Sequence, residues 1–303
     1  MELRDLAYFL ACIDEGHLTR AARHLHIAQP TLSHAIARLE AEAGESLLER
    51  PRKGRPTLSP TAAGRLLEHR ARRAIEEVQS FPDDLALLRG VTRGRIRIGS
   101  MQTLNSTVLP LPLAQFAMAH PQVEIQLHTL AAETIPQTLQ EGRIDIGLLA
   151  GAPASVVTEL TTQRLCTEEF VAIVRQGHAL ERRREIPLRL LRNEKFVFVL
   201  PGTFTHAILI EACRKAGFTP EVRLALESGE AIREVVKAGL GISVLPAGYI
   251  DRKDATLKAI RLTSPTPKRE VIAAWDRRTE PSIAVKAFIT SLEAHFSKSP
   301  LKR

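Results

Sequence analysis

The 303-residue sequence predicts an α+β protein of several domains: a small helical unit, a long connecting helix, and a larger α/β domain. Three patterns predict this. Apolar residues recur at helical spacing over residues 6–39, an apolar heptad repeat spans residues 67–88, and strand and helix patterns alternate from residue 94 onward. The length is about twice that of a typical domain, which agrees with more than one folding unit.

Composition narrows the class of protein. The sequence is 44% hydrophobic and 25% charged, which is typical of globular proteins. No apolar run approaches the ~20 residues needed to cross a bilayer, and Met1–Asp5 lacks the basic-then-apolar order of a signal peptide. We therefore expect a cytoplasmic protein.

The cysteines do not predict a disulfide framework. Cys12, Cys166 and Cys213 lie far apart, form no C-x-x-C pair and are odd in number. We expect small buried thiols, with a redox switch between Cys166 and Cys213 as the alternative.

The net charge of +8 points only weakly to a nucleic-acid partner, because residues 1–90 hold equal numbers of basic and acidic side chains. Local stretches are more informative. Residues 16–39 contain no acid but include Arg20, Arg23 and Arg38, and residues 50–73 hold a single acid, Glu68, among many cations. These two stretches could form a basic face.

The N-terminal pattern predicts three short helices. The first carries an apolar stripe, with Asp5 as its cap and Gly16 as its end. The second begins at Thr19, and Gln29-Pro30 opens the third after a tight turn. This is a helix-turn-helix pattern. The third helix would present groups able to reach base edges or phosphates: Gln29, Thr31, Ser33, His34 and Arg38. An ordinary three-helix bundle with a solvated outer face is the alternative.

The block from residue 18 to 64 resembles the winged helix-turn-helix of LysR-type transcriptional regulators. The matching core is T-x-A-A-x-x-L-x-x-x-Q-P-x-[LV]-S-x-x-I-x-x-L-E, from Thr19 to Glu40. The resemblance implies a backbone contact by Arg50 in the wing. It also implies base or groove contacts by Gln29, Pro30, Thr31, Ser33 and His34.

Three features of this block depart from the family pattern. His34 stands where arginine or glutamine is common, His17 replaces a common serine, and the wing is about two residues longer than usual, as judged from its Pro- and Gly-containing loop. Lys53 and Arg55 are further phosphate-contact candidates in that loop. His24-x-His26 lacks partners at zinc-finger spacing, so we expect no metal.

The connecting helix carries a heptad seam, which predicts packing against the same helix of a second subunit. The seam comprises Leu67, Ala71, Ala74, Val78, Phe81, Leu85 and Leu88. The family resemblance supports a homodimer or homotetramer. Packing on the helix's own chain is the alternative, and Pro82 should break or kink the helix.

From residue 94 the pattern predicts a mainly parallel α/β sheet in two sets of strands. The first set lies at 94–99, 123–127 and 145–149, with helices at 109–120 and 133–141. The second set of strands lies at 170–174, 196–199, 222–226 and 241–246. Two such sheets would bind a ligand between the carboxyl ends of their strands. A body that only oligomerises is the alternative.

This region also resembles the LysR-type effector domain, which is periplasmic-binding-protein-like and has two subdomains. The matching segments begin at Val108, Arg143 and Val236, and they read VLPLPLAQF, RIDIG and VKAGLGISVLP. We expect crossover strands near 161–165 and 262–270 and a last helix near 284–296. The predicted domains are a winged helix-turn-helix at 1–60, a linker helix at 61–90 and an effector domain at 91–303. The effector domain divides into subdomain I, at 91–163 and 266–303, and subdomain II, at 164–265.

Polar residues at strand ends and helix starts are the effector-site candidates. They are Ser100, Met101, Gln102, Thr129, Thr203, Phe204 and Ser228. Hydroxyls and free helix N–H groups suit a small anion such as a carboxylate. Each of these residues is as well explained singly as a helix cap.

Three functions follow from these patterns: an effector-responsive regulator of transcription, an architectural DNA-binding protein, or an enzyme with a DNA-binding head. The sequence has no G-x-S-x-G, Walker, H-E-x-x-H or dinucleotide motif, so we expect no enzyme and no cofactor. The first function is favoured. Its partners would be double-stranded promoter DNA, a small-molecule effector, further copies of the chain and RNA polymerase.

Overall fold

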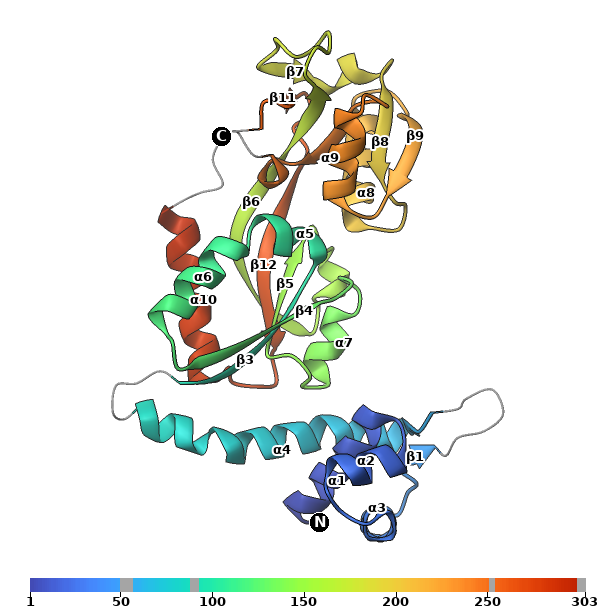
Figure 1. Ribbon diagram of the computed structural model, residues 1–303, viewed down its shortest axis with the longest axis vertical. Coiled ribbons are helices and arrows are strands. Elements are labelled where there is room, and N and C mark those ends of the chain that lie inside the picture. The colour runs from blue at the N-terminus through green and yellow to red at the C-terminus, as the bar shows by residue number, and fades with distance from the viewer. Residues whose placement is uncertain (50–56, 88–92, 251–253, 299–303) are drawn as a thin grey trace. The chain divides into compact units, whose positions relative to one another are not determined.

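The computed structural model describes residues 1–49, 57–87, 93–250 and 254–298 (Figure 1). Its contacts divide the chain into two compact units. The first unit contains residues 1–94 and 137–145, and the second contains residues 95–136 and 146–303. By these contacts the predicted linker helix belongs with the N-terminal helices.

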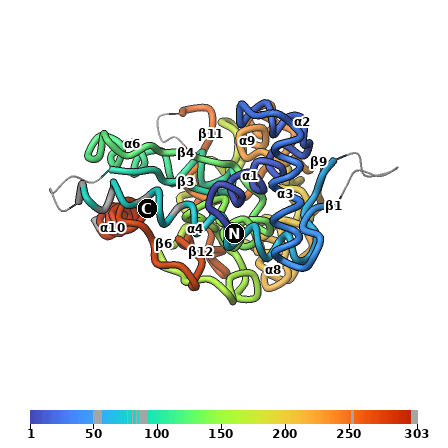
Figure 2. Tube along the Cα trace, turned by 90° about the horizontal axis from the view of Figure 1, so that it is seen from below, coloured from blue at the N-terminus to red at the C-terminus, as the bar shows by residue number. Residues whose placement is uncertain are grey.

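Three helices open the first unit: α1 (Leu3–Glu15), α2 (Leu18–His24) and α3 (Gln29–Ala43). The three helices lie together (Figure 2). Their buried apolar side chains form one core, which confirms the helical stripe. Gly16 ends α1 at φ 64° and Gln29-Pro30 opens α3, both as predicted.

Two predicted caps are wrong. α2 begins one residue before Thr19, with His17 at its N-cap. Asp5 lies inside the first turn of α1, where its carboxylate is buried and pairs with Arg38 of α3. Glu2 occupies the N-cap position without a side-chain cap bond, and both oxygens of Asp5 are directed to Arg38.

The wing is a two-stranded antiparallel pair, β1 (Leu48–Glu49) and β2 (Ser59–Pro60). Glu40 Oε1 accepts hydrogen bonds from the N–H groups of Leu47, at 2.8 Å, and Leu48, at 3.2 Å. Gly64 is required nearby, because a Cβ there would lie 2.0 Å from the carbonyl oxygen of Leu47. The wing contacts predicted for Arg50, Lys53 and Arg55 lie outside the described residues.

The connecting helix is one element, α4 (Ala62–Leu87), which includes Pro82. The predicted break is wrong. Proline removes one N–H donor and crowds the carbonyl four residues before it, and α4 continues through Pro82 as one helix despite both effects.

The heptad seam divides into two parts. Ala71 is buried in the core of the first unit, and Leu67 and Ala74 pack against that core. Val78 and Phe81 are instead 57% and 61% exposed, and Leu85 is 41% exposed. Packing on the same chain therefore explains the first half of the seam, while Leu88 lies outside the described residues.

The second unit has two lobes, each with its own apolar core. Lobe I is built on β3 (Gly94–Ser100), parallel to β5 (Ile146–Ala150). Its other elements are α5 (Gln102–Thr107), α6 (Pro110–Ala119), β4 (Val123–Thr129), the C-terminal helix α10 (Ile283–Lys298) and the turn η1 (Ala154–Val156). The helix α7 (Ile135–Gln140) leads into β5.

Lobe II surrounds a second core of Phe, Leu, Ile and Val side chains. Its strands are β7 (Glu185–Pro187), β8 (Lys195–Val199), β9 (Glu221–Leu226), β10 (Ser243–Pro246) and β11 (Leu257–Thr263). Its helices are α8 (Phe204–Lys215) and α9 (Gly229–Lys237), with short turns η2 (Leu188–Leu191) and η3 (Ala247–Tyr249).

Two long strands, β6 (Leu160–Arg175) and β12 (Lys268–Asp276), run side by side and join the lobes (Figure 1). The main sheet has the order β4-β3-β5-β12-β6-β11-β7, with β10 also paired to β6 and β8-β9 forming a separate pair. The first predicted crossover, 161–165, lies within β6, and the second, 262–270, runs from the end of β11 into the first residues of β12.

The prediction of a mainly parallel sheet is wrong. β12 runs antiparallel to both β5 and β6, and β10 and β11 run antiparallel to β6. Since the chain crosses from lobe I to lobe II on β6 and returns on β12, these two strands run in opposite directions. Within the described ranges, no helix is long and apolar enough to span a membrane.

Candidate DNA-contacting and effector sites

The outer face of α3 gathers the predicted base-contacting residues. Gln29, Pro30, Thr31 and His34 are exposed, and Ser33 is half-buried. Leu32, Ile36 and Leu39, on the opposite face of the helix, are buried in the core. Because the apolar face fixes the helix on its neighbours, the polar face is held outward, and its first turn is free of side-chain caps.

Arg38 and Thr19 have different surroundings from these residues. Both oxygens of Asp5 accept hydrogen bonds from Arg38 Nη2, at 2.6 and 2.7 Å, and the hydrogen bonds raise the pKa of Arg38. Arg38 therefore fastens α3 to α1, although half of its side chain remains exposed. Thr19 is exposed in the first turn of α2.

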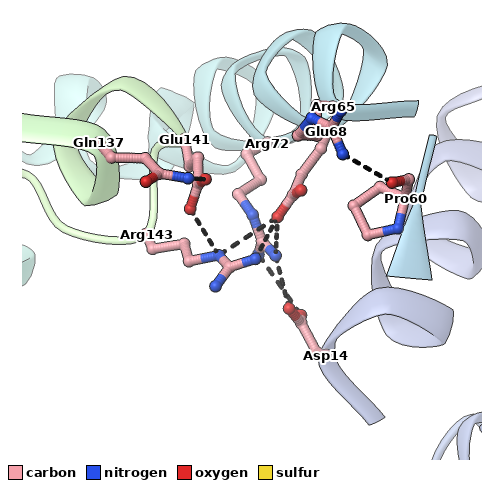
Figure 3. Close-up of polar contacts among 8 residues, drawn as sticks. All are labelled: Asp14, Pro60, Arg65, Glu68, Arg72, Gln137, Glu141 and Arg143. Carbon is pink, nitrogen blue, oxygen red and sulfur yellow. Dashed lines mark hydrogen bonds and ion pairs between the residues drawn. The ribbon is translucent and has the colours of Figure 1, made fainter. Parts of the chain in front are cut away.

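A second group of cations is also engaged within the first unit. Glu68, which is buried, accepts hydrogen bonds at Oε1 from Nη2 of Arg72, at 3.1 Å, and Nη2 of Arg143, at 2.8 Å (Figure 3). Arg72 also bonds Asp14 of α1, so it ties α4 to α1. This arginine of the basic stretch 50–73 is therefore held by carboxylates of its own chain.

The effector-site candidates of lobe I lie at the end of β3, at the end of β4 and at the start of α5, and the fold uses several of them. The sulfur of Met101 accepts the N–H of Ala150 at 3.2 Å, and Thr129 Oγ1 accepts Asn105 Nδ2 at 2.9 Å. Ser100 is fully buried, and Gln102 is exposed.

The candidates of lobe II act as helix caps. Thr203 Oγ1 accepts the N–H of His206 at 3.1 Å, and Ser228 Oγ accepts the N–H of Ala231 at 3.3 Å. Phe204 is half-buried in the first turn of α8. Both hydroxyls thus stand at helix N-termini, where N–H groups and the helix dipole favour negative charge.

Sequence reasoning missed a buried ion pair on the crossover strands. Glu168 of β6 and Arg269 of β12 face each other, with 2.8 Å between Arg269 Nε and Glu168 Oε2. Arg269 Nη1 also donates to Thr205 of α8 at 3.1 Å. A charged residue at an inward-facing position of each strand was the available signal, but it requires the strand register to be known.

Family models match both parts of the chain. Residues 3–65 match the model described as "Bacterial regulatory helix-turn-helix protein, lysR family". Residues 89–297 match the "LysR substrate binding domain". The chain belongs to the LysR family. It is a DNA-binding transcriptional regulator with an effector-binding domain, and not an enzyme.

Curated relatives of this LysR-family regulator match most of the chain. CfxR of Cupriavidus necator is 32% identical over 245 residues, covering 81% of this chain and 75% of that protein. GltC of Bacillus subtilis is 29% identical over 299 residues, covering 98% of each. Among solved structures, a full-length variant of OxyR from Pseudomonas aeruginosa has a TM-score of 0.77 at 23% identity, covering 97% of this chain and 98% of that one.

The thiols of this LysR-family regulator are poorly suited to redox chemistry. Burial raises the pKa of Cys12 and Cys166 to about 12 and that of Cys213 to about 11. The thiolate is the reactive form, so the raised pKa values lower its fraction near neutral pH. All three are free cysteines.

Among the described residues, no three His, Cys, Asp or Glu side chains form a metal-binding group.

The Asp5–Arg38 pair makes a stability prediction. Arg38→Ala should lower the melting temperature, because Asp5 is left buried without its cation. Arg23→Ala removes the same charge from an exposed site on α2 and should change the melting temperature little. The double variant Asp5→Ala/Arg38→Ala should recover part of the loss. Equal melting temperatures for the two single variants, measured by circular dichroism, would contradict the structural role.

Proposed function

We propose that this LysR-family regulator reads promoter DNA with the exposed face of α3 and adjusts that binding to a small anionic effector held in the second unit. The outward polar face of α3 carries the DNA part of the proposal. A short polar row on a helix that is fixed by an opposite apolar face is the arrangement that enters a major groove. CbnR, which has a similar fold with a TM-score of 0.66 at 24% identity, is solved in complex with its target DNA, and the match covers 97% of this chain and 99% of that one.

Base readout by α3 predicts a change in sequence preference. Gln29→Ala and Ser33→Ala should each relax discrimination at one base position by about 1–3 kcal/mol. Arg50→Ala should instead weaken binding to all sequences and lower the slope of log K against log salt by about 0.9. Binding to a panel of single-base operator variants separates the two effects. A uniform loss for all three variants would count against base readout.

The effector part of the proposal rests on two helix N-termini in lobe II. The caps Thr203 and Ser228 place the N-termini of α8 and α9 in lobe II, and both are suited to an anionic group. The regulatory domain of CcmR from Synechocystis was solved in complex with 2-PG. It has a TM-score of 0.61 at 25% identity and covers 69% of this chain and all of that chain. A small molecule bound by the same domain supports the same use here.

A peroxide response is not proposed, although the relatives include a hydrogen peroxide-inducible genes activator of Escherichia coli that is 29% identical over 98% of this chain. The raised thiol pKa values oppose oxidation of Cys166 or Cys213. Reversible binding of a small molecule remains the mode of sensing that suits this chain.

Sensing predicts that a metabolite changes both stability and promoter binding. An effector at 100 times its Kd should stabilise the protein by about 2.7 kcal/mol and should alter promoter protection at the same concentration. Thermal shift against a metabolite panel, followed by DNase protection, measures both effects. If no metabolite changes either one, the sensing function fails and the architectural alternative takes its place.

We also propose that the exposed half of the α4 seam joins two copies of the chain. Val78, Phe81 and Leu85 continue the heptad spacing beyond the part that packs on α1. Large exposed apolar side chains in such a row require a partner surface, and a second α4 has the matching repeat.

The seam predicts a change of mass in sedimentation. Val78→Glu should lower the oligomeric state and leave the melting temperature of the first unit nearly unchanged, because this side chain is exposed within one chain. Gln79→Glu, at the neighbouring exposed position, is the control for added charge. Leu67→Glu should instead destabilise the first unit. An unchanged mass for Val78→Glu would rule out this interface.

A further inference from the structure

The ion pair between the crossover strands uses only one oxygen of Glu168. Arg269 Nε and Nη2 lie 2.8 and 2.7 Å from Oε2, and Arg269 Nη1 is directed to Thr205. Both charged side chains are almost completely buried. Burying a charge pair is unfavourable unless its remaining hydrogen-bonding capacity is also satisfied.

The other oxygen of Glu168 is not satisfied. Oε1 is buried and has no hydrogen-bond partner in the described part of the chain, and the same is true of the Tyr249 hydroxyl and of Arg269 Nη2, whose approach to Oε2 is an ion pair without hydrogen-bond geometry. Glu168 and Tyr249 are 2% and 5% exposed. Most buried polar atoms in proteins do have partners, so such atoms in one region require an explanation.

Packing places Glu168 Oε1 where α5 of lobe I meets η3 of lobe II, and Tyr249 is the last residue of η3. A Cβ on Gly248 would lie 3.4 Å from Glu168 Oε1 and 2.9 Å from the Cβ of Thr107 in α5. The ring of Tyr249 covers Gly229 at the start of α9, where a Cβ would lie 2.5 Å from Cζ. The contact of Gly248 with Thr107 joins elements of different lobes, whereas the contact of Tyr249 with Gly229 lies within lobe II.

Glu168 Oε1 is the hydrogen-bond acceptor of this place. An ionised carboxylate only accepts hydrogen bonds, and the nearby Glu230 carboxylate already receives the hydroxyl of Ser228 at 2.7 Å. Burial, followed by the charge of Glu230, raises the pKa of Tyr249, so its hydroxyl stays protonated and can both donate and accept. A group that reaches Glu168 Oε1 must therefore donate a hydrogen bond.

We propose that Glu168 and Tyr249 form a subsite of the effector site for a hydrogen-bond-donating group, a hydroxyl or an ammonium. This inference rests on the proposed sensing function. With an anionic group at the N-termini of α8 or α9, it assigns the effector to the hydroxy- or amino-carboxylates, in preference to simple carboxylates. The subsite adds a donor requirement that the helix N-termini alone do not impose.

The test uses the full-length protein and three small probes that differ at one position. Acetate carries no donor, glycolate carries a hydroxyl and glycine carries an ammonium, and all three are small enough for size not to exclude them. Thermal shift over a concentration series at constant ionic strength gives each Kd. Glycolate or glycine should bind about tenfold more tightly than acetate, as one charge-assisted hydrogen bond implies.

Two variants and one matched control locate the effect. Tyr249→Phe removes only the hydroxyl, and Glu168→Gln removes the charge, so each should reduce the preference to less than about threefold. Because Glu168→Gln also weakens the pair with Arg269, Tyr249→Phe is the decisive variant. Ser243→Ala removes another buried hydroxyl without a partner among the described residues, in β10, and should leave the preference unchanged.

Several outcomes would overturn the subsite. They are equal affinity for the three probes, no binding of any probe, and a preference that survives Tyr249→Phe. A metabolite that shifts promoter binding and binds Tyr249→Phe with unchanged affinity would also overturn the subsite, but it would leave the sensing function standing. A glycolate preference abolished by Tyr249→Phe, with no metabolite acting on promoter binding, would keep the subsite and overturn the sensing function.

Discussion

The antiparallel pairing of β6 with β12 is the constraint on which the second unit depends. These two strands are paired from Leu160–Asp276 to Glu169–Lys268, and each carries side chains into both lobes. Their direction forces the mixed sheet, places Glu168 opposite Arg269, and brings α5 of one lobe against η3 of the other. An effector that changes how the lobes meet must act on this pair of strands and on the charges they bury.

In the first unit, two arginines of the basic stretches form ion pairs within the chain. Arg38 is held by Asp5, and Arg72 is held by Glu68 and Asp14, so these cations of the basic stretches fasten helices to one another. Affinity for phosphate must then come mainly from other cations, while α3 presents polar groups for readout. This division explains how a segment with balanced charge can still belong to a DNA-binding protein.

Local patterns predicted the elements well where a helix or strand is defined by the periodicity and turn residues of its own segment. The stripe of α1, the opening of α3 and the strands β3, β8 and β9 follow from periodicity and turn residues. The errors arose where tertiary contacts compete with local preference. Asp5 pairs with Arg38 and does not cap α1, and half of the α4 seam packs on α1. Thr203 and Ser228 lie where strand ends predicted them, but both of them cap helices.

The sequence by itself determined the family, because the block from Thr19 to Glu40 and the landmarks at Val108, Arg143 and Val236 depend on local spacing alone. It also determined which face of α3 is apolar and hence which face is free. The buried pair of Glu168 and Arg269 was decided only by tertiary structure, since the partners lie 101 residues apart and meet through strand register. That Arg38 pairs with Asp5 was likewise decided by packing, since the two residues lie on different helices.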